Sequence, residues 1–274
     1  MFLLPVIKLE VKMHKETYFK GLENLNLYYQ YWISSGETRA VLMVAHGFAE
    51  HSGRYGHLAE YFETRGYAVY ALDHRGHGKS DGVRVYVERF SDYVDDLKTF
   101  FDIIRENNPG KRIFLIGHSM GSAIALLYAA RFQNELAGLV TSGGGINSGS
   151  EPAPPPRPVG QPLPTNFLSR DPKVIEAYVN DPLVYRGPVP DGLGGKMTAV
   201  SDMVPLIELP VLIMAGNAVA DGTRSKTLFD RIGSKDKTLK LYDGLRHEIF
   251  NEPEHLQVFD DMAVWLEDHM KEDL

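Results

Sequence analysis

The sequence of 274 residues contains no cysteine, no block of lysine and arginine, and no long apolar run. Without cysteine the chain can form no disulfide, no thiolate nucleophile and no cysteine-bound zinc site. Its 36 acidic residues outnumber its 29 basic ones, which gives a formal net charge of −7 with histidine neutral. Contacts with phosphate groups need clustered positive charge, so we expect no binding to nucleic acid.

The apolar stretches are too short to act as targeting or membrane segments. None approaches the roughly 18–20 consecutive apolar residues that a membrane span requires. Residues 1–7 are mostly apolar but lack the basic residues that open a signal peptide, and Lys8, Glu10 and Lys12 follow at once. We therefore expect a cytoplasmic protein, and nothing in the sequence implies an obligate protein partner.

Short apolar runs alternate along the chain with stretches of helical periodicity. The runs are bounded by Gly, Pro or Asp, as is typical of strands buried on both faces. We predict strands at residues 25–32, 40–45, 67–72, 113–116, 138–141, 211–215 and 238–242. We predict amphipathic helices at residues 55–64, 93–106, 122–132, 225–232 and 254–270. This alternation predicts an α/β fold with a mostly parallel central sheet flanked by helices.

One interval interrupts the alternation. Seven of the thirteen residues from Pro152 to Pro164 are proline, which excludes a helix or an interior strand there. The whole interval from residue 149 to residue 209 is too long for an ordinary connection between elements of one sheet. We predict a core made of residues 1–148 and 210–274, with residues 149–209 inserted as a cap, or lid. A flexible linker between two domains is the alternative.

The pentapeptide Gly117-His118-Ser119-Met120-Gly121 fits the pattern Gly-x-Ser-x-Gly. A buried-strand pattern precedes it and a helical pattern follows, so Ser119 is predicted at a sharp strand-to-helix turn. Its hydroxyl would project above the sheet, where the helix N-terminus favours developing negative charge. We predict that Ser119 is a nucleophile. The alternative is that the two glycines only permit close packing.

A serine hydroxyl is a poor nucleophile unless a neighbouring base takes its proton. In a sheet of this kind the base is expected after the last strand, and His247 follows the strand predicted at residues 238–242. The other nine histidines lie in helical or terminal polar contexts, or in loops early in the sheet. We therefore predict that His247 is the base.

The loop after the strand at residues 40–45 begins His46-Gly47-Phe48 and matches the His-Gly type of oxyanion loop. The backbone N–H groups of Phe48 and Met120 could hold the oxyanion of a tetrahedral intermediate. Each such donor is worth about 3–4 kcal/mol. The alternative is a plain turn before a helix, which Gly47 alone would explain.

These stretches together resemble the α/β-hydrolase superfamily, and within it the monoglyceride lipase and lysophospholipase group. The resemblance is carried by residues 46–55, 73–80, 117–121, 171–184 and 237–242, and it covers the chain from Thr17 onward. It implies that Ser119 is the nucleophile, His247 the base, and the amides of Phe48 and Met120 the oxyanion hole. It also implies that the proline-rich insertion covers an acyl-binding channel.

The third member of the catalytic triad departs from the family pattern. The family places an aspartate three residues after the glycine that ends the preceding strand, but Val219 stands three residues after Gly216. A shortened loop accounts for the difference. Asp221 is the nearest carboxylate and is predicted as the acid, with Asn217 or a water molecule as the alternative acceptor for the imidazole N–H. Without an acid, turnover would fall by on the order of 10⁴.

The resemblance implies an esterase that cleaves monoacylglycerols through an acyl-enzyme. We expect substrate contacts from His46 and from the cap residues Phe167, Leu168, Ile175 and Leu183, although a core role fits the apolar ones equally well. The cap could also touch a membrane or micelle surface transiently. A lysophospholipase or a general carboxylesterase is the alternative enzyme. The altered acid loop also leaves open a weakly active or inactive hydrolase-fold binding protein.

No cofactor and no metal are expected. Gly78-Lys79-Ser80 resembles the end of a phosphate-binding loop, but Asp73 occupies the position of the earlier glycine. The segment from His247 to Asn251 resembles a zinc-protease helix only until Asn251, which stands where the second histidine would be.

Overall fold

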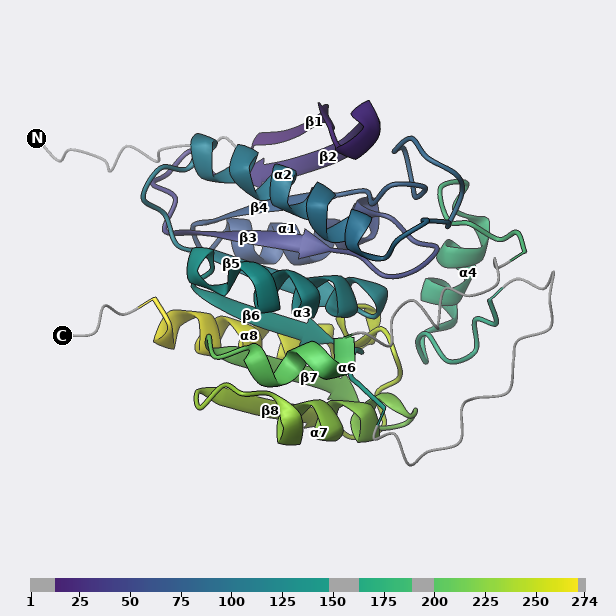
Figure 1. The fold of residues 1–274 in the computed structure, drawn as a ribbon. Coiled ribbons are helices and arrows are strands. Elements are labelled where there is room, and N and C mark those ends of the chain that lie inside the picture. The colour runs from purple at the N-terminus through teal and green to yellow at the C-terminus, as the bar shows by residue number, and fades with distance from the viewer. Residues whose placement is uncertain (1–12, 148–162, 189–199, 271–274) are drawn as a thin grey trace, which may run out of the picture.

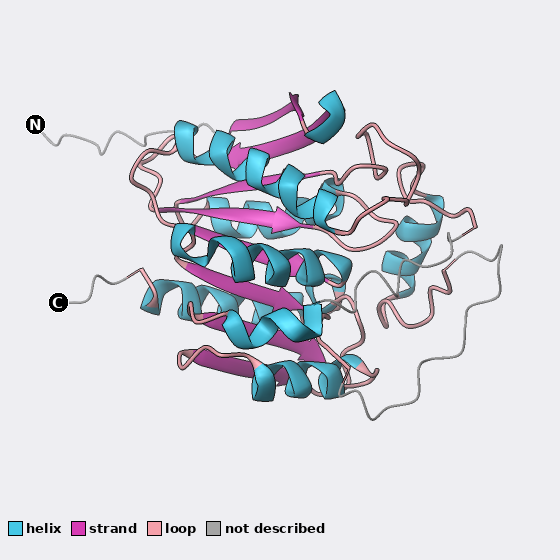
Figure 2. Ribbon diagram, in the orientation of Figure 1, coloured by secondary structure: helices cyan, strands magenta, loops and turns pink. Residues whose placement is uncertain are grey.

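The computed structural model describes residues 13–147, 163–188 and 200–270. Within these residues, eight strands form one sheet in the order β1-β2-β4-β3-β5-β6-β7-β8. The edge pair β1 (Met13–Lys20) and β2 (Asn26–Ile33) is antiparallel, and β2 is antiparallel to β4 (Tyr67–Leu72). All the other pairs are parallel. The predicted mostly parallel sheet is confirmed (Figure 2).

The remaining strands are β3 (Ala40–Ala45), β5 (Ile113–His118), β6 (Gly138–Ser142), β7 (Val211–Gly216) and β8 (Lys237–Tyr242). The bounds predicted for β3 and β4 are those of the structure, and the other five predictions differ only at the strand ends. Every residue of β3 to β7 is buried. Helices cover both faces of these strands, which explains why their sequences are continuous apolar runs.

The helices on one face of the sheet are α2 (Ser91–Asn107), α3 (Met120–Phe132) and α7 (Asp221–Arg231), and those on the other are α1 (Gly56–Glu63) and α8 (His255–Asp268) (Figure 1). Successive side chains of a strand point to opposite faces. In β3, Val41 and Met43 therefore join the apolar core on the α2 and α3 side, whereas Leu42 and Val44 join the core on the α1 and α8 side. The sheet separates two cores.

All five predicted helices form, with different starts. The helix predicted at residues 122–132 begins at Met120, directly after Ser119, and the one predicted at 225–232 begins at Asp221. The helix predicted at 55–64 forms as α1, but Tyr55 belongs to the 3-10 turn (Ser52–Tyr55) that precedes it. The predicted nucleophile Ser119 thus directly precedes one helix, and Asp221 is the first residue of another.

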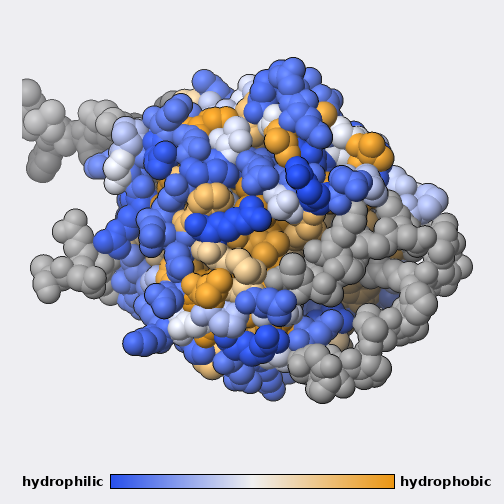
Figure 3. Space-filling view, in the orientation of Figure 1, coloured by the Kyte–Doolittle hydropathy of each residue, from blue (hydrophilic) through white to orange (hydrophobic). Residues whose placement is uncertain are grey.

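Helix α3 is apolar around its whole circumference. The apolar residues on the face drawn in Figure 3 gather mainly at its middle, over this helix. All residues from Met120 to Ala129 are buried, because α2 and α6 (Val200–Met203) also pack against α3. A helix held on several sides keeps the turn at its N-terminus in a defined position.

Some elements are missing from the sequence prediction. Strand β1 lies at the sheet edge and buries only Phe19 of its eight residues, so it has no apolar alternation to detect. Helix α4 (Pro172–Asn180) forms where only short apolar patches were expected. Its start had a signal in the sequence, since Pro172 is the first helical residue and the Asp171 side chain accepts from Lys173 N at 2.8 Å.

The predicted cap is described only in part. The proline-rich stretch up to residue 162 and the amino-terminal residues 1–12 lie outside the described residues. Helix α4 lies beyond the carboxyl ends of the parallel strands, on the side to which their arrows point (Figure 1). Among the helices of the described residues, none combines the length and apolarity needed to cross a bilayer.

Candidate active site

Ser119 lies in the tight turn between β5 and α3. Its φ of 53° and ψ of −115° are a strained conformation for a residue with a β-carbon. Glycine is required on both sides of it. A β-carbon at Gly117 would overlap the carbonyl oxygen of Gly121, and one at Gly121 would overlap the carbonyl oxygen of Ala45. The turn has the geometry of a nucleophile elbow.

His247 lies in the loop after β8, with its Nδ1 at 2.7 Å from Asp221 Oδ2. A carboxylate can only accept a hydrogen bond, so Nδ1 carries a hydrogen, and in the neutral ring Nε2 then has the lone pair. The two side chains are only 12% and 8% exposed, which limits competition from water. The imidazole is therefore held in the tautomer that can take a proton through Nε2.

Asp221 is the first residue of α7. Asn217, the alternative partner of the imidazole, has its amide directed elsewhere. Its Nδ2 donates to Asp243 Oδ1 at 2.5 Å, and its Oδ1 accepts from Gly244 N at 2.9 Å. The structure thus brings Asp221, and not Asn217, to His247.

The Ser119 turn and the His247 loop meet at the carboxyl end of β6. Ser119 N donates to Ser142 O at 2.9 Å. At the next residue, Gly143, an added β-carbon would lie 2.7 Å from His247 O and 3.2 Å from His247 Nδ1. The ring of His118, which directly precedes Ser119, lies 4.9 Å from the His247 ring. Residues far apart in sequence therefore share one edge of the sheet.

The two predicted oxyanion donors belong to segments at the same edge. Phe48 lies in the loop after β3, and Met120 opens α3, where a backbone N–H has no helical carbonyl four residues earlier. Glu50 Oε1 accepts from Gly47 N at 2.6 Å. A β-carbon at Gly47 would lie 3.3 Å from Ser119 Cβ, so this loop packs closely against the Ser119 turn.

His46 is wholly buried at the start of the predicted oxyanion loop. Its Nδ1 donates to Gly47 O at 2.7 Å, and its Nε2 accepts from His74 N at 3.0 Å. Burial lowers the pKa of His46 to about 4, so the ring is neutral at pH 7. Both ring nitrogens are bonded to the backbone, and this placement contradicts the predicted substrate contact of His46. The ring supports the loop instead.

Phe167 connects the described part of the predicted cap to the His247 loop. His247 N donates to Phe167 O at 3.1 Å, and Glu248 N donates to Leu168 O at 2.8 Å. The Phe167 ring lies 5.1 Å from the His247 ring. Of the predicted substrate contacts, Phe167 is therefore the one placed directly beside His247.

Leu168 and Ile175 belong to a small apolar cluster within the described part of the predicted cap. Leu168 is buried with Tyr178 and Val184, and Ile175 packs against the same cluster. This is the core role that the sequence left open for them.

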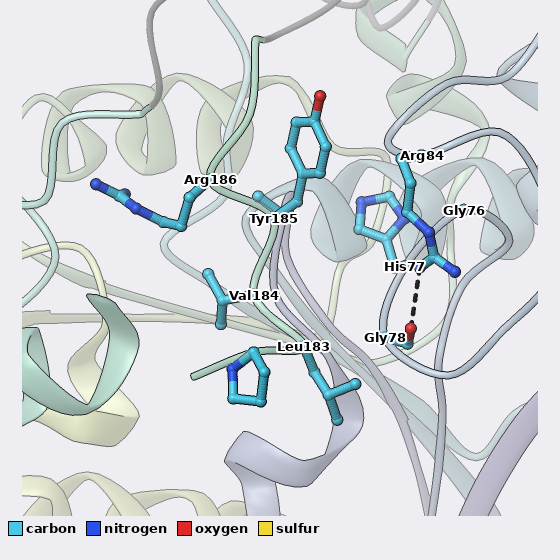
Figure 4. A pocket seen from close by; sticks show the side chains of 10 residues that line it. Gly76, His77, Gly78, Arg84, Leu183, Val184, Tyr185 and Arg186 are labelled. Carbon is cyan, nitrogen blue, oxygen red and sulfur yellow. Dashed lines mark hydrogen bonds between the residues drawn. The ribbon is translucent and has the colours of Figure 1, made fainter. Parts of the chain in front are cut away.

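A cavity of about 320 Å³ lies beside the oxyanion loop (Figure 4). Its lining residues are Ala49, Gly76, His77, Gly78, Arg84 and the segment 182–186. Tyr185 N donates to Ala49 O at 2.8 Å, which joins the segment 182–186 to the residue after Phe48. Leu183, another predicted substrate contact, lies in this wall.

Sequence reasoning missed one group of buried charges at the site. Arg54 lies between Glu50 of the oxyanion loop and Glu248 of the His247 loop, and bonds to both. Glu50 and Arg54 belong to the stretch 46–55 that carried the family resemblance. Nothing in the sequence paired them with a residue almost two hundred positions away.

Comparisons with known proteins place this chain among hydrolases. The family described as serine aminopeptidase, S33, matches residues 36–254. A monoacylglycerol lipase from Mycolicibacterium smegmatis is 36% identical over 271 residues, covering 92% of this chain and 96% of that protein. Phospholipase YtpA from Bacillus subtilis is 30% identical over 240 residues, covering 80% and 92%. The crystal structure of Paleococcus ferrophilus monoacylglycerol lipase superposes with a TM-score of 0.75 at 28% identity, covering 89% and 99%.

The fold and these relatives define a serine hydrolase of the α/β-hydrolase class. The chain belongs to the serine aminopeptidase S33 family, and it is a monoacylglycerol-lipase-like ester hydrolase. The resemblance inferred from the motifs in the sequence is confirmed.

Proposed function

We propose that the protein hydrolyses monoacylglycerols to fatty acid and glycerol, with Ser119, His247 and Asp221 as its catalytic triad. The observation that carries the proposal is the 2.7 Å contact between His247 Nδ1 and Asp221 Oδ2, at the sheet edge that also bears the Ser119 turn. The substrate class is supported by the relatives from M. smegmatis and P. ferrophilus, which are monoacylglycerol lipases.

In the acylation step, Ser119 Oγ attacks the ester carbonyl carbon while His247 Nε2 takes the hydroxyl proton. The amides of Phe48 and Met120 bind the resulting oxyanion, each contributing about 3–4 kcal/mol to its stabilisation. The bond from the carbonyl carbon to the glycerol oxygen then breaks, and the imidazolium gives its proton to that oxygen. Asp221 stays ionised and holds the imidazole tautomer throughout.

In the deacylation step, a water molecule attacks the acyl carbon while His247 takes one of its protons. The ester bond to Ser119 breaks, the proton passes to Ser119 Oγ, and the fatty acid leaves. This second half uses the same base and the same oxyanion donors, so one site serves both half-reactions.

Residues 149–209 are assigned to a cap inserted between two parts of the core, residues 1–148 and 210–274. The position of α4 and the bonds from the segment at Phe167 and Leu168 to the His247 loop support this division. Phe167 and Leu183 are the acyl-channel contacts that the structure supports best. Each methylene buried there contributes up to about 0.8 kcal/mol, so chain-length preference follows channel depth. The cap is also the part that would touch a micelle or membrane surface.

The test is fatty-acid release from monooleoylglycerol by the wild-type protein and by Ser119→Ala. The wild type should release fatty acid with saturation kinetics, and Ser119→Ala should release none above background. A wild-type protein that labels with a fluorophosphonate but leaves monooleoylglycerol intact would refute the substrate class. An active Ser119→Ala variant would refute the nucleophile.

A lysophospholipase is the second candidate, favoured by the similarity to phospholipase YtpA. Hydrolysis of monooleoylglycerol, lysophosphatidylcholine and p-nitrophenyl esters of increasing chain length, compared by kcat/KM, separates the two and a general carboxylesterase. A hydrolase-fold binding protein without activity would react poorly with fluorophosphonate, because its serine would not be activated.

A further inference from the structure

A buried chain of charged groups joins the oxyanion loop to the His247 loop. Arg54 Nη1 donates to Glu50 Oε2 at 2.6 Å and to Glu248 Oε1 at 2.7 Å. Arg54 Nη2 donates to Glu248 Oε2 at 2.7 Å. The side chains are 10% exposed at Arg54 and 3% exposed at each carboxylate. One planar guanidinium therefore binds a carboxylate from each loop, with two parallel bonds to Glu248.

The two carboxylates of this charge network, Glu50 and Glu248, each lie next to a residue of the proposed mechanism. Glu50 Oε1 accepts from Gly47 N at 2.6 Å, and Gly47 directly precedes Phe48. Glu248 directly follows His247, and its Oε2 also accepts from Asn251 Nδ2 at 3.1 Å. The two carboxylates thus hold the backbone one residue from an oxyanion donor and one residue from the base.

The cluster is both charged and shielded from water. Burial alone would raise the pKa of Glu50, but the neighbouring Arg54 brings it down to about 2. The Tyr55 hydroxyl donates to Glu50 Oε1 at 2.8 Å, and the ring of Tyr178 in α4 lies 4.7 Å from the guanidinium carbon. A buried charge network with these bonds is rigid, and removing Arg54 leaves the two buried carboxylates without their counter-charge.

We propose that Arg54 is a positioning residue that sets the separation between the Phe48 amide and the His247 imidazole, by binding one carboxylate from each loop. It touches no reacting atom and acts through Glu50 and Glu248. The proposal rests on the roles proposed above for Phe48 and His247, and adds a residue that those roles do not by themselves require. A displacement of about 1 Å between catalytic groups can lower a rate by about 10²-fold.

The experiment compares Arg54→Gln and Arg54→Lys with Arg131→Gln as the matched control. Arg131 is exposed on α3 and pairs only weakly with Asp95, at 3.5 Å. Arg54→Gln should lower kcat for monooleoylglycerol by about 10²-fold with little change in KM. Arg54→Lys should recover only part of this loss, because an ammonium cannot reproduce the planar fork. Arg131→Gln should keep the wild-type kcat.

A double-mutant cycle of Glu50→Gln and Glu248→Gln tests the link itself, with Glu106→Gln on the exposed face of α2 as control. Either substitution weakens the same bridge, so the double variant should lose little more than the worse single variant. Losses that simply multiply would mean that the two carboxylates act independently, and would overturn the proposal.

Fluorophosphonate labelling of Ser119 separates this proposal from the substrate assignment, because labelling needs the base and the oxyanion hole but no glycerol ester. The labelling rate should fall with kcat in Arg54→Gln at an unchanged circular dichroism spectrum. A folded Arg54→Gln protein with wild-type kcat and labelling rate would overturn the proposal, as would a raised KM at unchanged kcat. If Arg54→Gln does not fold, the same readouts on Arg54→Lys and Glu248→Gln decide the matter.

Discussion

Asp221 Oδ2 lies 2.7 Å from His247 Nδ1, although Val219 occupies the sequence position at which the family pattern places the acid. The carboxylate comes from the first turn of α7, which begins at Asp221 itself. A negative charge is favoured at a helix N-terminus, so this position suits an ionised aspartate. The chain thus presents a carboxylate to the imidazole from a helix rather than from the preceding loop.

Replacing Asp221 should collapse esterase turnover. Asp221→Ala removes the acceptor of the Nδ1 hydrogen and leaves the imidazole free to rotate or change tautomer, so kcat should fall by on the order of 10⁴. Steady-state hydrolysis of p-nitrophenyl butyrate measures this. Asp230→Ala, on the exposed side of the same helix, is the control and should keep the wild-type kcat. Unchanged activity in Asp221→Ala would exclude Asp221 as the acid.

The Ser119 turn should tolerate no side chain at Gly121. In Gly121→Ala the new methyl group would overlap the Ala45 carbonyl oxygen, so the backbone must move. We expect a loss of about 1–3 kcal/mol in the free energy of unfolding, together with slower fluorophosphonate labelling. Urea titration and labelling kinetics measure the two effects.

Gly56→Ala is the matched control for that substitution. Gly56 opens α1 with a helical φ of −56°, and nothing lies within 4 Å of an added β-carbon. The variant should gain about 0.4–1 kcal/mol of stability. A Gly121→Ala protein as stable and as reactive as Gly56→Ala would contradict the assigned turn geometry.

Replacing Phe167 should mainly affect catalysis, whereas replacing Leu168 should mainly affect stability. Phe167→Ala removes a ring beside His247 and should lower kcat/KM for long-chain more than for short-chain esters, with a smaller effect on the melting temperature than Leu168→Ala because the ring is only partly buried. Leu168→Ala opens a cavity among Tyr178 and Val184 and should lower stability by about 2–5 kcal/mol. Kinetics with esters of several chain lengths and thermal melts measure both. Identical behaviour of the two variants would contradict the different placements of the two side chains, since Leu168 is buried in that cluster whereas Phe167 is partly buried against it.

Acid should destabilise the fold between pH 6.5 and 4. Burial lowers the pKa of His46 and His118 to about 4 and that of His77 to about 3, and holds the pKa of His74 well below its usual value. Histidines of the unfolded chain titrate near 6.5. In this window the unfolded state binds more protons than the folded state, so stability falls as the pH falls.

His77→Gln tests this linkage by removing one of the four groups. The loss of unfolding free energy per pH unit, measured by urea titration from pH 6.5 to 4.5, should shrink by about 1.4 kcal/mol relative to the wild type. From pH 7.5 to 8.5 the slopes of the two proteins should be equal, which serves as the internal control. An undiminished slope at acid pH would show that His77 takes up a proton in the folded state.

The sequence by itself determined the parallel part of the sheet and the position of Ser119, and it predicted His247 as the base. Strands β3 to β7 are buried on both sides, so each one is an apolar run that composition alone reveals. Gly117 and Gly121 flank Ser119 because no larger residue fits there, and this requirement can be seen in the sequence as the Gly-x-Ser-x-Gly pattern. The sequence did not predict edge strand β1, because only Phe19 of its residues is buried and the strand therefore has no apolar run.

The tertiary structure alone decided which side chains meet at the carboxyl edge of the sheet. It directs Asn217 to Asp243 and Asp221 to His247, it buries the His46 ring at the start of the predicted oxyanion loop, and it joins Glu50, Arg54 and Glu248. Parallel strands deliver loops from distant parts of the chain to one edge. Which side chains of these loops bond to each other depends on their directions in three dimensions, and no local sequence pattern predicts those directions.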